Sequence, residues 1–281
     1  MQKTLKKYFA IFALPTLIAF ALAFLIPFLM GIYLSFTEFT TVVDAKWVGL
    51  RNYIEVFTQN QDFLNALWFT VRFTVVSIVT INVLSFALAM LLTKGIRGTN
   101  LYRTVFFMPN LIGGIVLGYI WQLIINGVLY SFGVTITAKP EYGFWGLVIL
   151  MNWQLIGYMM IIYIAGILNI PPDMIEAAGI DGASSFQILR KITIPLVMPS
   201  VTICTFLTLT NSFKLFDQNL ALTAGAPSKQ TAMLALDIYN TFYGRAGSEG
   251  VGQAKAVLFF IMVAAIALTQ LYLTRSKEVE N

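Results

Sequence analysis

The sequence has no histidine and a single cysteine, Cys204, among 281 residues. These absences exclude disulfide frameworks, catalytic histidines and the cysteine and histidine ligand sets of structural zinc sites. A Gly-x-x-x-x-Gly-Lys-Ser/Thr phosphate loop is also missing, so the chain has no ATP site of that kind. We therefore expect no enzyme active site, no metal site and no cofactor bound by this chain. If ATP drives the protein, another chain must bind and hydrolyse the ATP.

Charged residues are scarce as well, at 11% of the sequence against about 25% in an average soluble domain. Hydrophobic residues make up 58%. This composition is typical of an all-α polytopic membrane protein. No linker, low-complexity stretch or clear repeat divides residues 1–281, so we expect one membrane domain without a basic nucleic-acid face.

Six segments are apolar over about 20 residues, the length that a helix needs to cross a hydrocarbon core. The first resembles a signal peptide, but its apolar run exceeds the roughly 7 to 15 residues of a signal segment, so we expect it to be retained. Pro195 and Pro199 are expected to loosen the first turns of the fifth span. The predicted spans are residues 9–36, 68–92, 104–125, 144–168, 192–215 and 254–273.

Lysine and arginine predict the orientation, because they concentrate in short cytoplasmic connections. A cytoplasmic N-terminus leaves six basic residues in the longer outer loops and two, Arg72 and Lys214, near outer helix ends. Both termini are therefore predicted to be cytoplasmic. The basic residues then placed inside are Lys3, Lys6, Lys7, Lys94, Arg97, Arg103, Arg190, Lys191, Arg275 and Lys277.

The connection of residues 169–191 is the least membrane-like stretch in the second half of the chain. It lies between the fourth and fifth spans, on the predicted cytoplasmic side. Ala177, Ala178 and Ala183 are small enough to let a partner approach closely. We expect another protein to bind this connection.

Two capping boxes predict a helix, a turn and a helix within this connection. The first would pair Asp173 with Glu176, and the second would pair Ser184 with Gln187. Gly182 lies between them and permits a sharp turn, because it can adopt backbone angles closed to other residues.

The order of residues here resembles the cytoplasmic coupling motif of binding-protein-dependent ABC importer permeases. That motif is Glu-Ala-Ala, a glycine four residues later, and then Ile-x-Leu-Pro, for which this chain has Ile194 in place of Leu. The resemblance implies a type I ABC importer permease fold whose coupling helix binds an ATPase subunit. The residues implied in coupling are Glu176, Ala177, Ala178, Gly182, Ala183, Ile192 and Pro195.

Three other stretches resemble carbohydrate permeases of the oligosaccharide and glycerol-phosphate type: residues 47–57, 101–126 and 211–227. Phe69 and Ala226 depart from the usual Asn and Gly of those permeases. The resemblance implies sugar import across a bacterial-type plasma membrane by alternating access. It also implies a second homologous permease, two ATPase subunits that use ATP and Mg²⁺, and an extracytoplasmic solute-binding protein.

Polar residues in the fourth and fifth spans are candidates for the sugar path, because a polar stripe is costly to expose to lipid. Amides beside an indole form a surface on which sugars stack and hydrogen-bond. Helix-to-helix hydrogen bonding is the alternative role for the amides, and mutual pairing is the alternative for Lys214 and Asp217. The candidates are Asn152, Trp153, Gln154, Thr208, Asn211, Lys214, Asp217 and Gln218.

Other transport mechanisms remain alternatives, since six spans alone would also suit a secondary transporter or a facilitator of small solutes. Secondary transporters usually carry acids within their spans, and no acid lies in the middle of a predicted span. Gly114 and Gly118 form a Gly-x-x-x-Gly pair on the third span, for which we expect close helix packing.

Overall fold

The structure is a computed structural model that describes residues 9, 13–58, 61–244 and 246–275. The chain divides into two compact units, Met1–Phe63 with Ile238–Phe260, and Leu64–Asp237 with Ile261–Asn281. We describe each unit on its own. Lys3, Lys6, Lys7 and Lys277 of the charge count lie outside the described residues, and the side chain of Arg275 is not described.

The first unit begins with an apolar helical segment, Ala13–Leu34, which contains a π-helical stretch, η1 (Ala21–Leu25), and α2 (Ile26–Leu34). Most of its side chains are exposed, as expected of a helix that faces lipid or another chain. The helical residues fall within the predicted first span, 9–36, of which residues 10–12 are not described.

A small hairpin follows α2 and holds the two β-strands of the described residues. β1 (Thr37–Glu38) pairs antiparallel with β2 (Lys46–Trp47), with η2 (Val42–Asp44) between them and α3 (Arg51–Thr58) after them.

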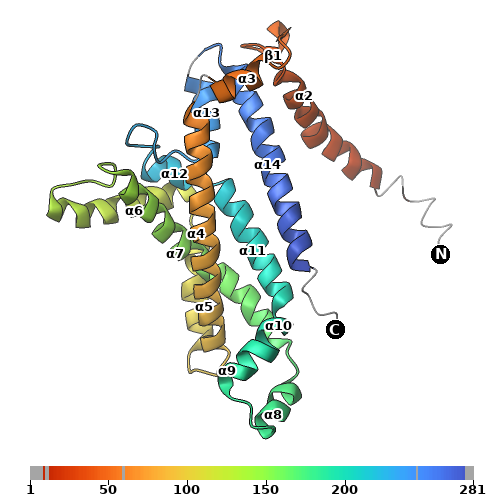
Figure 1. Ribbon diagram of the computed structural model, residues 1–281, viewed down its shortest axis with the longest axis vertical. Helices are drawn as coiled ribbons and strands as arrows, with labels where there is room; N and C mark the ends of the chain where they lie inside the picture. Colours follow the sequence, from red (N-terminus) through yellow and green to blue (C-terminus); the bar gives the residue numbers. More distant parts are fainter. Residues whose placement is uncertain (1–8, 10–12, 59–60, 245, 276–281) are drawn as a thin grey trace. The chain divides into compact units, whose positions relative to one another are not determined.

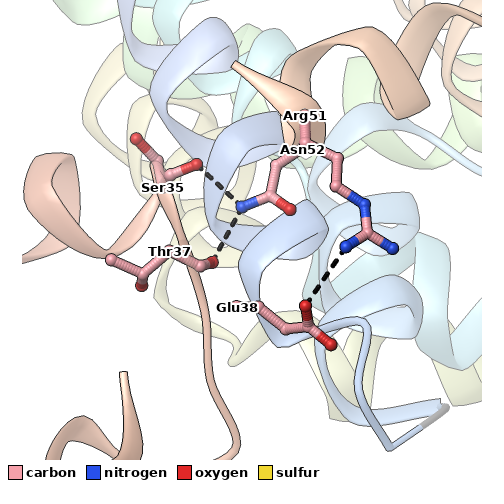
Figure 2. A network of polar contacts seen from close by, with 5 residues as sticks. All are labelled: Ser35, Thr37, Glu38, Arg51 and Asn52. Carbon is pink, nitrogen blue, oxygen red and sulfur yellow. Dashed lines mark hydrogen bonds and ion pairs between the residues drawn. The ribbon is translucent and has the colours of Figure 1, made fainter. Parts of the chain in front are cut away.

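Polar contacts fasten this hairpin to α3 (Figure 2). Asn52 Nδ2 donates to the carbonyl oxygens of Ser35 and Thr37 at 2.9 and 2.8 Å, and Arg51 pairs with Glu38 at 3.3 Å. The hydroxyl of Thr40 donates to Asp44, as do the backbone N–H groups of residues 40 and 41. These donors lower the pKa of Asp44 to about 2, because they stabilise its ionised form.

The second unit contains most of the helices (Figure 1). Its core surrounds α7 (Pro140–Leu168), where Leu147, Leu150 and Met159 are fully buried. The helices that lie in it wholly or in part are α4 (Gln61–Leu92), α5 (Thr99–Phe107), η3 (Met108–Leu111), α6 (Gly114–Leu129), η4 (Tyr130–Phe132), α7 (Pro140–Leu168), α8 (Pro172–Ile180), α9 (Ser185–Ile188), η5 (Leu189–Thr193), α10 (Ile194–Leu196), α11 (Met198–Phe213), α12 (Asp217–Leu222), α13 (Leu234–Gly244) and α14 (Glu249–Arg275).

Five described helices are long and apolar enough to cross a membrane, or six if one bent pair counts as a single span. The predicted spans 68–92, 144–168 and 254–273 each fall inside one of them, namely α4, α7 and α14.

The predicted third span, 104–125, is wrong as a continuous helix. α5 ends at Phe107, a 3₁₀ turn follows, and α6 begins only at Gly114 after extended residues at 112 and 113. Pro109 lacks an N–H donor and the paired glycines favour a break, so the chain changes direction here. Apolar length alone does not reveal this break.

The predicted fifth span, 192–215, is bent. The helical segments Ser185–Leu196 and Met198–Phe213 meet at an angle of 67°. Val197 lies between Pro195 and Pro199, and prolines remove the backbone donors that a straight helix would use.

Candidate functional site

The 169–191 connection folds as a helix, a turn and a helix, at the lower end of Figure 1. The second predicted capping box is confirmed: the Ser184 N–H donates to Gln187 Oε1 at 2.7 Å, and the Gln187 N–H donates to Ser184 Oγ at 3.3 Å. The first box is wrong. Pro171 is the N-cap of α8 and makes no side-chain cap bond, so Asp173 is the second residue of the helix and lies within its first turn. The proline pair starts the helix because its backbone angle is already suited to a first turn.

Gly182 closes α8 in a left-handed conformation, with φ of +78°. The Ala183 N–H donates to the Ala178 carbonyl at 2.9 Å, and the Gly182 N–H donates to the Gly179 carbonyl at 3.1 Å. This is the Schellman arrangement, in which a glycine after the helix lets its last carbonyls be satisfied. The turn is therefore shaped by its own backbone.

The surface of this turn is exposed. Glu176 and Ala177 are exposed, no residue of α8 is buried, and no atom would lie within 4 Å of a side chain added at Gly182. Ile192 and Pro195 lie apart from it, in the helix that leads to the bend at Val197. The predicted coupling residues thus divide between an exposed turn and a helix stem.

A polar cavity of about 540 Å³ lies between α7, α11 and α12 in the second unit. It holds five of the eight predicted path residues: Gln154, Asn211, Lys214, Asp217 and Gln218. Its other lining residues are Asn110, Met151, Leu155, Tyr158, Leu207, Leu215 and Phe216. Sequence reasoning missed Asn110 and Tyr158. The proline before Asn110 was the available signal, since it places an amide at a helix break.

The cavity presents hydrogen-bonding groups of both kinds. Gln218 Nε2 donates to Gln154 Oε1 at 2.8 Å, which joins α12 to α7 across the cavity wall. Lys214 and Asp217 are exposed, and within the described chain no ion pair joins them. The cavity can therefore donate to and accept from a solute with many hydroxyl groups.

The other three predicted path residues do not line this cavity. Asn152 Nδ2 donates to Thr80 Oγ1 at 2.9 Å and to the Val148 carbonyl at 2.8 Å, so its amide joins two helices. Trp153 packs against Trp121 with ring centroids 5.7 Å apart. Successive residues point about 100° apart on a helix, so 152, 153 and 154 face three directions.

The third of these residues, Thr208, is fully buried, and its hydroxyl donates to the Cys204 carbonyl at 2.8 Å. The expected single polar face of the fifth span is also divided. α11 ends at Phe213, and Gln218 reaches the cavity from α12 after the chain turns.

The Gly-x-x-x-Gly pair positions one wall of the cavity, as predicted for close packing. A Cβ added at Gly114 would lie 2.7 Å from Asp217 Cβ, and one added at Gly118 would lie 2.7 Å from Ala221 Cβ. Gln122 Nε2 also donates to the Leu222 carbonyl at 2.9 Å. α6 and α12 therefore approach through their backbones.

Residues 88–277 match the family model described as the binding-protein-dependent transport system inner membrane component. The chain belongs to this family. The matched residues include both the exposed turn and the cavity.

Individual proteins are similar over nearly the whole chain. This permease is 46% identical to the probable starch degradation products transport system permease protein AmyD of Thermoanaerobacterium thermosulfurigenes, covering 97% of this chain and 96% of that protein. It is 29% identical to the multiple sugar-binding transport system permease protein MsmF of Streptococcus mutans serotype c, covering 99% of each.

The fold of the permease has a counterpart of known structure. A chain of the bacterial ABC transporter involved in the import of the acidic polysaccharide alginate superimposes with a TM-score of 0.81, at 20% identity and over 98% of both chains. The permease is thus a multi-pass membrane protein with the type I ABC importer fold.

Proposed function

We propose that this permease imports an oligosaccharide, together with a second homologous permease, and that separate ATPase subunits drive it. The polar cavity is the observation that carries the proposal. Its amides, ammonium and carboxylate can bond sugar hydroxyls, and Tyr158 offers a ring on which a sugar can stack. Its volume lies within the roughly 300 to 1,000 Å³ of ordinary small-molecule sites.

The class of cargo is supported by the relatives. AmyD is named for starch degradation products and MsmF for multiple sugars. Short glucose oligomers are therefore the first substrates to test. A neutral sugar also suits a cavity whose lining carries one cation and one anion, Lys214 and Asp217, because these charges cancel in the net charge of the lining.

The last turns of α8 and the exposed turn that follows it form the coupling surface in this proposal. An ATPase subunit binds Glu176, Ala177, Ala178, Gly182 and Ala183, and its closure on ATP moves the stem that holds Ile192 and Pro195. The bend at Val197 carries that movement to α11, whose far end lines the cavity. The turn and both termini then lie in the cytoplasm, and a solute-binding protein delivers sugar from outside.

Reconstitution tests the proposal. The permease is purified with its second permease and ATPases, placed in liposomes, and supplied with binding protein and labelled maltotriose. Uptake that requires ATP supports an ABC importer. Uptake driven by an ion gradient in the absence of ATP would instead support a secondary transporter or a facilitator.

A further inference from the structure

On α4, α7 and α11 of the second unit, four buried polar atoms have no hydrogen-bond partner among the described residues. They are Thr74 Oγ1, Ser77 Oγ, Asn152 Oδ1 and Ser212 Oγ. Each belongs to a residue that is at least nine-tenths buried, and Ser77 and Ser212 are fully buried. Hydroxyls on membrane helices commonly bond the carbonyl one turn earlier, so the lack of that bond here requires another partner.

The first three atoms belong to α4 and α7, two helices that side-chain hydrogen bonds join. Thr74 and Ser77 are three residues apart, one turn along the same face of α4. Thr80 is a further three residues on, and its hydroxyl accepts from Asn152 Nδ2 at 2.9 Å. The unpartnered oxygen of the same Asn152 amide therefore lies beside this face.

Ser212 reaches the same level from α11. Asn82 Nδ2 donates to the Thr208 hydroxyl at 3.5 Å, which sets α11 against α4. α7 runs parallel to α4, because residue 80 bonds residue 152 and the later residue 85 bonds the later residue 156. α11 runs antiparallel to α7, because residue 200 bonds residue 162 and the later residue 204 bonds the earlier residue 159. Ser212 is thus one turn beyond Thr208, toward the part of α4 that holds Ser77.

We infer that these groups form a buried water-binding site between α4, α7 and α11. A water molecule can accept a hydrogen bond from a serine or threonine hydroxyl and donate one to Asn152 Oδ1, and buried waters make about three such bonds. A metal ion could bind the same oxygens but could not accept hydrogen bonds from the hydroxyl groups. Water therefore matches this set of donors and acceptors.

This site is separate from the polar cavity, because none of its four residues lines that cavity. Met151 and Asn211 line the cavity, and Asn152 and Ser212 follow them in sequence and face other directions. Water-bridged contacts can be remade with little loss when helices shift, because water offers both donors and acceptors. The site would thus keep the contact between three spans adaptable during transport.

The test is a high-resolution cryo-electron microscopy map of the purified transporter in lipid nanodiscs, together with thermal unfolding of Ser77→Ala and Thr74→Val variants. We expect water density within hydrogen-bond distance of Ser77 Oγ and Asn152 Oδ1, and its loss in Ser77→Ala. The unfolding midpoint of each variant should fall by about 2 to 4 °C, because bonds to bound water are lost. Thr210→Val is the control, since that hydroxyl already bonds the Phe206 carbonyl at 3.0 Å.

The opposite result is equally specific. If no water binds these hydroxyl groups, each is a buried polar group without a partner, which destabilises the fold. Removing such a hydroxyl should then raise the unfolding midpoint instead. A rise in both variants, or no density in a map that resolves other interior waters, would overturn the inference. If Ser77→Ala cannot be purified, Ser212→Ala gives the same sign test.

Discussion

Gly157 is the position where an added methyl group should do the most harm. A Cβ at this residue of α7 would lie 1.9 Å from the Phe106 carbonyl oxygen and 2.7 Å from the Phe107 nitrogen. Ordinary contact begins at 3.4 Å, and both obstacles are backbone atoms at the end of α5, which no change of rotamer can move. In Gly157→Ala, α5 and α7 must therefore separate.

The expected size of this effect follows from two opposing terms. Alanine favours a helix over glycine by about 1 kcal/mol, whereas overpacking a tight contact costs about 1 to 3 kcal/mol and occasionally more. Because backbone meets backbone here, we expect the upper part of that range, a net loss of about 2 kcal/mol and a fall of about 4 to 8 °C in the unfolding midpoint. Sugar uptake should fall too, because neighbouring residues Leu155 and Tyr158 line the cavity.

Thermal unfolding in nanodiscs and uptake in liposomes would measure both effects. Gly127→Ala is the matched control: it also lies within a helix, α6, but nothing lies within 4 Å of its added Cβ, so it should be neutral or stabilising. If Gly157→Ala is as stable and as active as Gly127→Ala, the close approach of α5 to α7 is not as described.

Three further predictions concern the turn, the cavity and the hairpin. Gly182→Asp should keep the protein in the membrane but reduce recovery of the ATPase and transport, because a side chain at φ of +78° strains an exposed surface; unchanged ATPase recovery would contradict it. Asn211→Cys, in a Cys204→Ser background, should be labelled by a small water-soluble reagent in resting or ATP-trapped complexes, and labelling in neither would remove Asn211 from the pathway. Asp44 has a lowered pKa, so it stabilises the hairpin above its unfolded pKa of about 3.9, and this stabilisation disappears as pH falls toward 2. The difference in midpoint between wild type and Asp44→Asn should therefore shrink from pH 5 to pH 2, and a constant difference would refute the role of these bonds.

Features set by neighbouring residues could be predicted from the sequence. The Ser184 capping box and the Gly182 turn depend on atoms within a few residues of one another, and both are present. The packing role of Gly114 and Gly118 was also predictable, because a pair of small residues four apart leaves a flat helix surface.

Features set by distant residues could not be predicted in the same way. The break before Gly114 and the hydrogen bond from Asn152 to Thr80 depend on the positions of other helices. Gln154 lines the cavity, but the residue that it bonds there, Gln218, is 64 positions away in the sequence, and no local pattern relates the two. The cavity is therefore a product of tertiary packing more than of any one span.

The close contact between α6 and α12 makes the cavity wall depend on the outer surface of the protein. Ile115, Tyr119 and Leu123 of α6 are exposed on faces that α12 does not cover, while Gly114 and Gly118 press on α12 beside Asp217 and Gln218. Two backbones in such contact cannot slide independently, so a tilt of α6 displaces those two cavity residues as well. If the cavity holds sugar as proposed, a bilayer thickness that makes α6 tilt would therefore also change how tightly the permease holds its cargo.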